Sequence, residues 1–219
     1  MACQDDSDAT HRKAIEELCE IYWYPIYAFV RRKGRSVQDA QEMTQTFFVK
    51  ILESGFFEKA NPENGRLRSF LMKSVSNFLV SDYRKSLEAK GVFVESIDFE
   101  QGERRFQADS FAKETPETLF EKRWATTLID EVFARLETET TQKFGADTAR
   151  LLIAHLRGTS AVSGLQELAA KLGLSEPAIK VRMHRLRQDY RRLLRKEVAD
   201  TIGPQDDVDA EIRALIALL

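Results

Sequence analysis

Apolar side chains recur every three or four residues along most of the chain, which is the period of an α-helix buried on one side. Pro25 interrupts the first such stretch and predicts a kink or a break there. No segment shows the alternation typical of a strand, so the predicted fold class is all-α, in two helical bundles. The predicted helices cover residues 14–32, 37–52, 67–87, 116–136 and 146–156, with two more after residue 165.

Turn and cap residues set the boundaries of these helices. Ser36 is a predicted N-cap with Asp39 three residues later, and Thr115 is a predicted N-cap followed by Pro116 in the first turn. Periodicity fades and acidity rises over residues 88–115, which predicts an interdomain linker with a short hydrophobic contact around residues 92–99. The predicted organisation is a first domain over 1–87, a linker over 88–115, a second domain over 116–197 and an acidic extension over 198–219.

The most specific local pattern lies in residues 165–187. Ala169 is small where two helices would cross, Gly173 suits a turn with positive φ, and Ser175 suits the cap of the next helix. This spacing predicts a helix-turn-helix whose second helix enters the major groove of DNA. The predicted contacts to the −35 duplex come from eight residues: Glu176, Ala178, Lys180 and Val181 near base edges, Arg182, Arg185 and Arg187 mostly at phosphates, and the capping residue Ser175. The alternative is a helical hairpin whose second helix has a solvated basic face.

A second basic stretch, residues 66–85, interleaves aromatic residues with basic and small polar ones. This mixture is typical of surfaces that bind single-stranded DNA, where backbone contacts combine with base stacking. Phe70 and Phe78 fit the core better than a stacking surface. The predicted contacts to melted DNA are Arg68, Lys73, Asn77, Ser81, Arg84 and Lys85, with Asn77 and Ser81 placed to reach an extruded base.

The formal net charge of −2, taken alone, argues against binding nucleic acid, but it is a sum of opposed blocks. Residues 66–90 hold six basic and two acidic side chains, and residues 165–197 hold nine basic and four acidic ones. Each basic block is followed by an acidic one, in residues 95–121 and 198–219. The two stretches that suggest DNA binding are therefore the two basic ones.

Several function classes find no support in the sequence. We expect no secretory leader, no membrane-spanning helix, no metal site and no cofactor, because apolar runs are short and the two cysteines and three histidines lack ligand spacing. No catalytic constellation or glycine-rich phosphate loop appears, so we expect a protein that is not an enzyme. The simplest expectation is a reduced, cytoplasmic protein.

Together, these stretches resemble the extracytoplasmic-function (ECF) class of bacterial RNA polymerase sigma factors, over residues 14–199. Residues 38–48, Gln-Asp-Ala-Gln-Glu-Met-Thr-Gln-Thr-Phe-Phe, resemble the Asp-Ala-Glu-Asp-Leu-Val-Gln-Glu-Thr-Phe helix of sigma region 2. Residues 68–84 are similar to the promoter-melting helix, with Asn77 at its characteristic asparagine, although its usual Trp-Leu pair is Phe70-Leu71 here. Residues 165–187 are similar to the region 4 helix-turn-helix, and the tail resembles an extension found in a subgroup of the class.

The resemblance implies a transcription initiation factor, with core RNA polymerase and promoter DNA as partners and an anti-sigma factor as a further candidate. The first domain then binds the polymerase clamp and captures the melted −10 element, with the loop at residues 55–67 holding a flipped base. The second domain reads the −35 element. The residues that match the clamp-binding surface are Asp39, Gln41, Glu42, Gln45 and Thr46.

Two other functions compete with this one. A stand-alone helix-turn-helix regulator would bind duplex DNA tightly without polymerase, as a dimer. A helical adaptor whose basic faces bind acidic proteins would show no salt-dependent DNA binding. The acidic tail also has two interpretations: a small amphipathic helix over 208–219 that packs on the second domain, which we favour, or a shield for the basic face of the helix-turn-helix.

Overall fold

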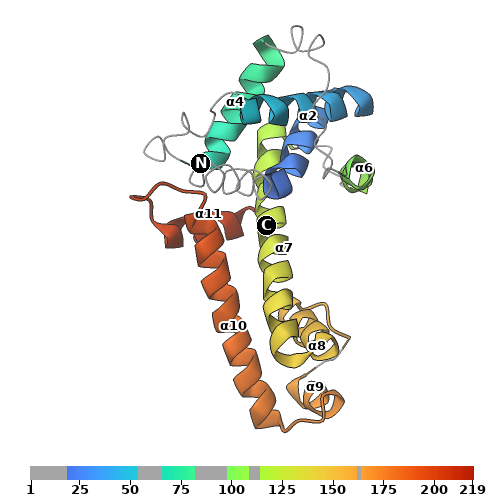
Figure 1. Cartoon of the computed structure of the whole chain (residues 1–219), viewed down its shortest axis with the longest axis vertical. Coiled ribbons are helices and arrows are strands. Elements are labelled where there is room, and N and C mark those ends of the chain that lie inside the picture. The colour runs from blue at the N-terminus through green and yellow to red at the C-terminus, as the bar shows by residue number, and fades with distance from the viewer. Residues whose placement is uncertain (1–18, 54–65, 82–97, 109–113, 162–163) are drawn as a thin grey trace, which may run out of the picture. The chain divides into compact units, whose positions relative to one another are not determined.

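The computed structural model describes residues 19–53, 66–81, 98–108, 114–161 and 164–219 (Figure 1). All regular secondary structure in these ranges is helical, which confirms the all-α prediction. By its internal contacts the chain divides into a first unit, Met1–Thr127 with Thr201–Leu219, and a second unit, Leu128–Asp200. The acidic extension therefore belongs to the first unit, and so do the first turns of the helix that begins at Pro116.

A helix over residues 19–32 forms the centre of the first unit. Residues 24–30 are all buried, Pro25 included, and the helix continues through the proline without a break. Burial on all sides stabilises the helix, so it persists although proline lacks a backbone N–H. Phe29 packs edge-to-face on Phe120 with ring centroids 6.3 Å apart.

Helices α2 (Val37–Glu53) and α4 (Leu67–Ser81) pack against each other in the first unit. Ser36 caps α2 as predicted, since its hydroxyl accepts a hydrogen bond from the Asp39 N–H at 3.1 Å. The rings of Phe47 and Phe78 lie 5.7 Å apart between the two helices. Phe78 is buried and Phe70 half-buried, as expected of core residues. The remaining positions of the predicted third helix, residues 82–87, lie outside the described residues.

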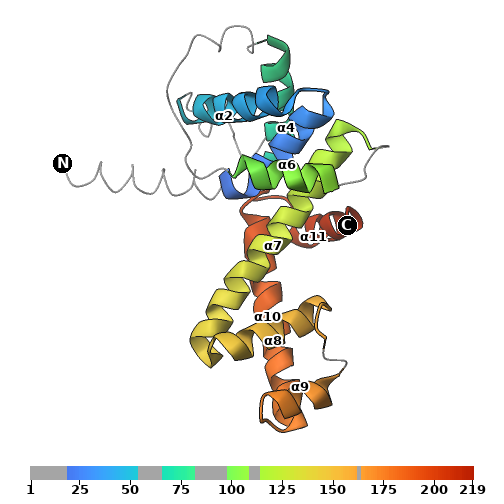
Figure 2. The ribbon, with the colours of Figure 1, turned by 90° about the vertical axis from the view of Figure 1, so that its right-hand side faces the viewer.

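The predicted linker contains a helix that the sequence pattern did not reveal, α6 (Phe99–Ala108). It packs on the helix over residues 19–32 (Figure 2). Gly102 permits this close approach, because a Cβ atom there would come within 2.8 Å of the Trp23 ring. Glu103 accepts hydrogen bonds from Arg31 at 3.0 Å and from the Tyr27 hydroxyl at 2.5 Å. Part of the predicted linker is therefore a component of the first unit.

The long helix α7 (Pro116–Phe144) begins in the first unit and contributes its remaining turns to the second. Thr115 caps it as predicted, accepting from the Thr118 N–H at 3.2 Å. Leu119, Phe120 and Trp124 are fully buried in the first unit.

The position of the C-terminal helix differs from the prediction that it packs on the second domain. Helix α11 (Val208–Ala217) does form where a small amphipathic helix was predicted, but it packs within the first unit rather than on the helix-turn-helix. The Leu67 N–H donates to the Thr201 carbonyl at 3.1 Å, and Leu215 is fully buried. The physical reason is a combination of apolar burial at Leu215 and opposite charge, since Glu211 of α11 forms ion pairs with Arg66 and Arg68 at the start of α4.

The second unit consists of the rest of α7 with α8 (Ala146–Arg157), α9 (Leu165–Lys171) and α10 (Glu176–Ala199). Its core holds Leu128, Val132 and Leu136 of α7 with apolar residues of the other three helices: Ala149, Leu152, Ile153, Leu168, Ala169, Ile179, Met183, Leu186 and Leu193. Ion pairs also join α7 to α10: Arg135 to Glu197 at 2.6 Å, Glu139 to Arg192 at 2.7 Å and Lys143 to Asp189 at 3.2 Å.

Candidate nucleic-acid interface

The turn between α9 and α10 has the geometry that the sequence predicts. Gly173 has a φ of +64°, in the left-handed region that favours glycine. The Leu174 N–H donates to the Ala169 carbonyl at 2.9 Å, so the carbonyls at the end of α9 are satisfied. Ser175 caps α10, its hydroxyl accepting from the Ala178 N–H at 3.4 Å. These contacts fix the first turns of α10 beside α9, as Figures 1 and 2 show.

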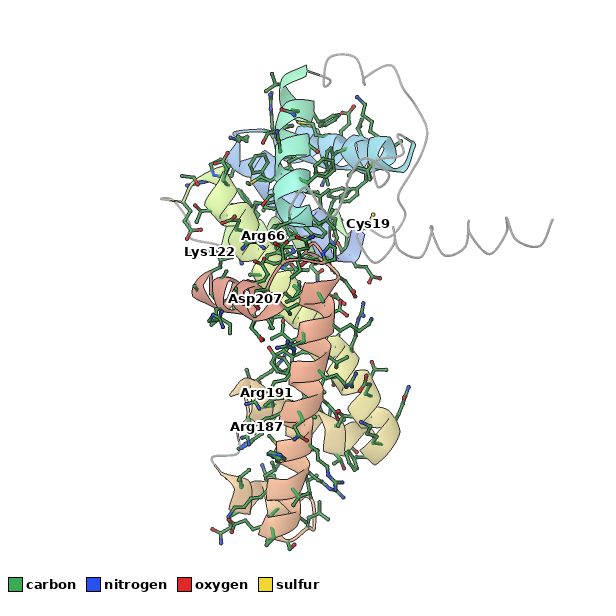
Figure 3. The ribbon with its side chains drawn as sticks, turned by 90° about the vertical axis from the view of Figure 1, so that its left-hand side faces the viewer. Cys19, Arg66, Lys122, Arg187, Arg191 and Asp207 are labelled. Atoms are coloured by element: carbon green, nitrogen blue, oxygen red, sulfur yellow. The ribbon has the colours of Figure 1, made fainter. Side chains whose placement is uncertain are left out.

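The surface of α10 combines a neutral stripe with a cationic flank on each side. Ile179, Met183 and Leu186 face the core at helical spacing. The same spacing puts Pro177, Val181, His184 and Gln188 on the opposite side, and all four are exposed. Lys180, Arg187 and Arg191 follow one edge of this stripe, and Arg182 and Arg185 follow the other. Figure 3 labels Arg187 and Arg191 along α10.

The eight predicted −35 residues all lie at the surface of the second unit, exposed or half-buried. Lys180 pairs with Glu176 one turn earlier, at 2.8 Å. The guanidinium of Arg182 lies 4.6 Å from the centre of the Phe144 ring, so α7 supports that side chain. Within the described part of the chain, Arg185 and Arg187 are held by no ion pair.

Three further residues of this surface are not among the eight predicted contacts. Gln188 and Arg191 are exposed about three and four turns into α10, and His184 lies within the neutral stripe. Helical spacing in the sequence is the pattern that indicates them: His184 and Gln188 continue the neutral stripe from Val181, and Arg191 continues the cationic flank from Lys180.

Helix α4 presents a second stripe, in the first unit. Lys73, Asn77 and Val80 are exposed at helical spacing, and Val80 is 90% exposed. Arg66, just before the helix, begins the same stripe and was missing from the predicted contacts. Ser81 ends α4, and the predicted residues Arg84 and Lys85 lie outside the described residues, as do residues 55–65 of the predicted base-holding loop.

Arg68 differs from the prediction, since its side chain points into the first unit. It is only 5% exposed, its guanidinium lies 4.6 Å from the centre of the Trp124 ring, and it forms an ion pair with Glu211. Burial and the neighbouring Arg66 charge lower the pKa of Arg68, but the guanidinium remains protonated at neutral pH. Arg68 occupies the buried side of α4, so in this conformation it is not available to DNA.

The predicted clamp-binding residues form one side of α2. Ala40, Met43 and Phe47 are buried on the other side. Glu42 is exposed, while Asp39, Gln41, Gln45 and Thr46 are half-buried. All five are therefore accessible from solvent.

The hydrogen bonds to Glu103 also shift pKa values in the first unit. Burial alone would raise the pKa of Glu103, but hydrogen bonds from Arg31, Tyr27 and Gln107 outweigh it and hold the pKa below its ordinary value. Burial and the neighbouring carboxylate raise the pKa of Tyr27. The carboxylate is therefore ionised at neutral pH and anchors α6.

Other kinds of site find little support among the described residues. A cavity of about 520 Å³ lies between α7 and α10 of the second unit, but its cations Arg135, Arg192 and Lys196 already pair with Glu197, Glu139 and Asp200. No group of three His, Cys, Asp or Glu within the described ranges is placed to hold a metal ion. None of the described helices is long and apolar enough to cross a membrane.

Comparison of the chain with models of known protein families, with curated protein sequences and with solved structures found no match.

Proposed function

We propose that the protein is a transcription initiation factor of the ECF sigma class, a dissociable subunit that directs core RNA polymerase to promoters. The observation that carries the proposal is the surface of α10. A neutral stripe between two cationic flanks fits a helix in the major groove, where base edges meet the stripe and phosphates of both strands meet the flanks. The capped, glycine-containing turn before it is the expected support for such a helix.

The second element of the proposal is capture of melted DNA by α4. Its stripe combines Arg66 and Lys73 for phosphates with Asn77 for the edge of an unpaired base. Because a base must leave the helical stack to be read on its pairing edge, this step resembles base flipping. The two basic stretches then have separate tasks, one on duplex DNA and one on a single strand.

The third element is binding to polymerase through α2. The five accessible residues of its outer side match the clamp-binding positions of the family motif. In this role the factor needs no cofactor and no catalytic residue of its own, since the polymerase supplies the chemistry.

Core binding by α2 variants tests this assignment. We expect the wild-type chain to co-elute with bacterial core RNA polymerase, and Glu42→Lys to weaken that binding by about tenfold, since one charge reversal at an interface costs on the order of 1.4 kcal/mol or more. Glu100→Lys is the matched control, because Glu100 is 88% exposed on α6 and outside the proposed contact surface. Tight duplex binding by a dimer that ignores core polymerase would instead identify a stand-alone regulator.

A further inference from the structure

Glu211 of α11 is an unusually buried acid in an acidic tail. It is 2% exposed, and its two carboxylate oxygens pair with different arginines: one with Arg68, and the other with Arg66 at 3.0 Å. Arg68 is buried as well, whereas the Arg66 side chain is still 44% exposed. One carboxylate thus bridges a buried cation and a surface cation at the start of α4.

The tail is held in this position by contacts on both sides of Glu211. Before it, the Thr201 carbonyl accepts from the Leu67 N–H, and Asp207 caps α11 by accepting from the Asp209 N–H at 2.9 Å. After it, Leu215 is fully buried one turn further on. Figure 3 labels Arg66 at the start of α4 and Asp207 at the start of α11.

We propose that the tail, residues 201–219, is a self-docked competitor of nucleic acid, in which the Glu211 carboxylate occupies the anion site that a DNA phosphate takes on Arg66 and Arg68. The inference rests on the proposed function of α4. A guanidinium binds carboxylates and phosphates through the same parallel hydrogen bonds, so the two anions exclude each other. A single strand lying along Lys73 and Asn77 reaches Arg66 next, because Arg66 begins the same stripe.

The kind of contact favours competition over simple bracing. A buried ion pair contributes little net stability, since desolvation of its charges offsets their attraction, and apolar residues of similar size would brace the helix as well. A charged pair with one cation at the surface has a property that an apolar contact lacks: a second anion can replace the first. The tail therefore lowers the affinity of α4 for a strand until another contact displaces α11.

The first test neutralises the competing charge in the full-length chain. The probe is a fluorescently labelled oligothymidylate, and binding is followed by anisotropy over a range of salt concentrations. We expect Glu211→Gln to bind about threefold to tenfold more tightly than the wild type, with a salt slope steeper by about 0.7, the contribution of one additional phosphate on a single strand. Asp209→Asn is the matched control, since it removes the same charge from the first turn of α11.

The second test displaces α11 from the first unit and leaves the Glu211 charge unchanged. Leu215→Asp places a carboxylate in the core contact, and Ile216→Asp places the same group on an adjacent position that is 58% exposed. We expect Leu215→Asp to tighten binding by about tenfold or more, because both arginines become available, and Ile216→Asp to produce no gain. Circular dichroism of each variant checks that the helices are retained.

The outcomes separate the competition from the function on which it rests. If the wild type and Glu211→Gln bind equally, and Lys73→Ala weakens both, α4 binds nucleic acid and the competition is wrong. If no variant binds the oligothymidylate at low salt, the proposed function of α4 fails, and the competition fails with it. Equal gains in affinity in Glu211→Gln and Asp209→Asn would mean that any loss of negative charge in the tail tightens binding. That result would also overturn the proposal.

Discussion

The basic residues of α10 face solvent, whereas the arginines at the start of α4 are held by a carboxylate from the C-terminal helix. On α10 the acids at positions 189 and 197 pair with α7 cations, which leaves Arg185 and Arg187 exposed. At the start of α4, the Glu211 carboxylate of α11 pairs with Arg66, which begins the exposed stripe, and with the buried Arg68. Two stretches of similar net positive charge in the sequence thus differ in how accessible their arginines are in the fold.

The difference explains the alternation of basic and acidic blocks along the chain. Acids of the two acidic blocks, residues 95–121 and 198–219, pair with cations of the first unit: Glu103 with Arg31, Glu117 with Lys33 and Glu211 with Arg66 and Arg68. The acids that make the total charge near-neutral therefore pair mainly with cations of the first unit. The basic surface of α10 in the second unit stays exposed to solvent. The four predictions below test this contrast, from the largest expected effect to the smallest.

Charge reversal on α10 should abolish most duplex binding. For Arg185→Glu with Arg187→Glu we expect affinity for duplex DNA to fall about a hundredfold and the salt slope to fall by about two, because two phosphate contacts are lost. Arg150→Glu on α8 is the control, as its side chain is 72% exposed and paired only within its own helix, with Asp147. Filter binding over a salt series measures both quantities. An unchanged affinity would contradict the role of α10, and a wild type without salt-dependent DNA binding would favour an adaptor that binds acidic proteins.

We expect the turn before α10 to affect the stability and DNA binding of the second unit and to leave the stability of the first unit unchanged. Gly173→Ala forces a β-carbon into a left-handed conformation, and we expect a loss of about 1–2 kcal/mol in the stability of the second unit with weaker duplex binding. Gly164→Ala is the control, because its φ of −164° is ordinary extended backbone and no atom lies within 4 Å of the added carbon. Thermal unfolding followed by circular dichroism compares the two variants. Equal effects would mean that the turn geometry is unimportant.

The Glu103 hydrogen bonds should stabilise the first unit in a pH-dependent way. Because the folded pKa of Glu103 lies below its ordinary value of 4.5, its contribution is fully present above that pH and disappears as the pH falls through the lower folded value. We expect Glu103→Gln to cost about 1 kcal/mol at pH 7, and the difference from the wild type to shrink in acid. The only two tryptophans, Trp23 and Trp124, both lie in the first unit, so their fluorescence in urea reports it selectively. A difference that is constant with pH would contradict this role of the carboxylate.

We do not expect every ion pair formed by the acidic segments to contribute to the stability of the first unit. Lys33 and Glu117 are 39% and 47% exposed, so Lys33→Met should change stability by about 0.5 kcal/mol or less. The same tryptophan fluorescence measures it. A loss as large as that of Glu103→Gln would mean that exposure does not distinguish these pairs.

Much of the fold follows from local sequence. The caps at Ser36, Thr115 and Ser175, and the turn at Gly173, depend on residues within a few positions of one another, and the structure confirms them. The predicted surface residues of α10 also follow from local spacing, since helical periodicity alone separates the buried side from the exposed one.

The contacts that the sequence did not reveal are the long-range ones. Helix α6 packs through Phe99, a glycine and a charged network, and Phe99 and Phe106 are its only large apolar residues, so its sequence looks like a polar linker. The place of α11 depends on Glu211 meeting arginines about 145 positions earlier, and nothing local distinguishes that acid from its neighbours. Arg68 was assigned to DNA for the same reason: its charge is visible in the sequence, but its partner is not.

Transcription with purified components tests the proposed function most directly. Bacterial core RNA polymerase is mixed with the full-length protein on a library of genomic DNA fragments, and the 5′ ends of the transcripts are mapped. We expect discrete start sites that share an upstream duplex motif, that disappear without the protein, and that are lost with Arg185→Glu/Arg187→Glu but kept with Arg150→Glu. Transcripts that are identical with and without the protein would contradict the proposal.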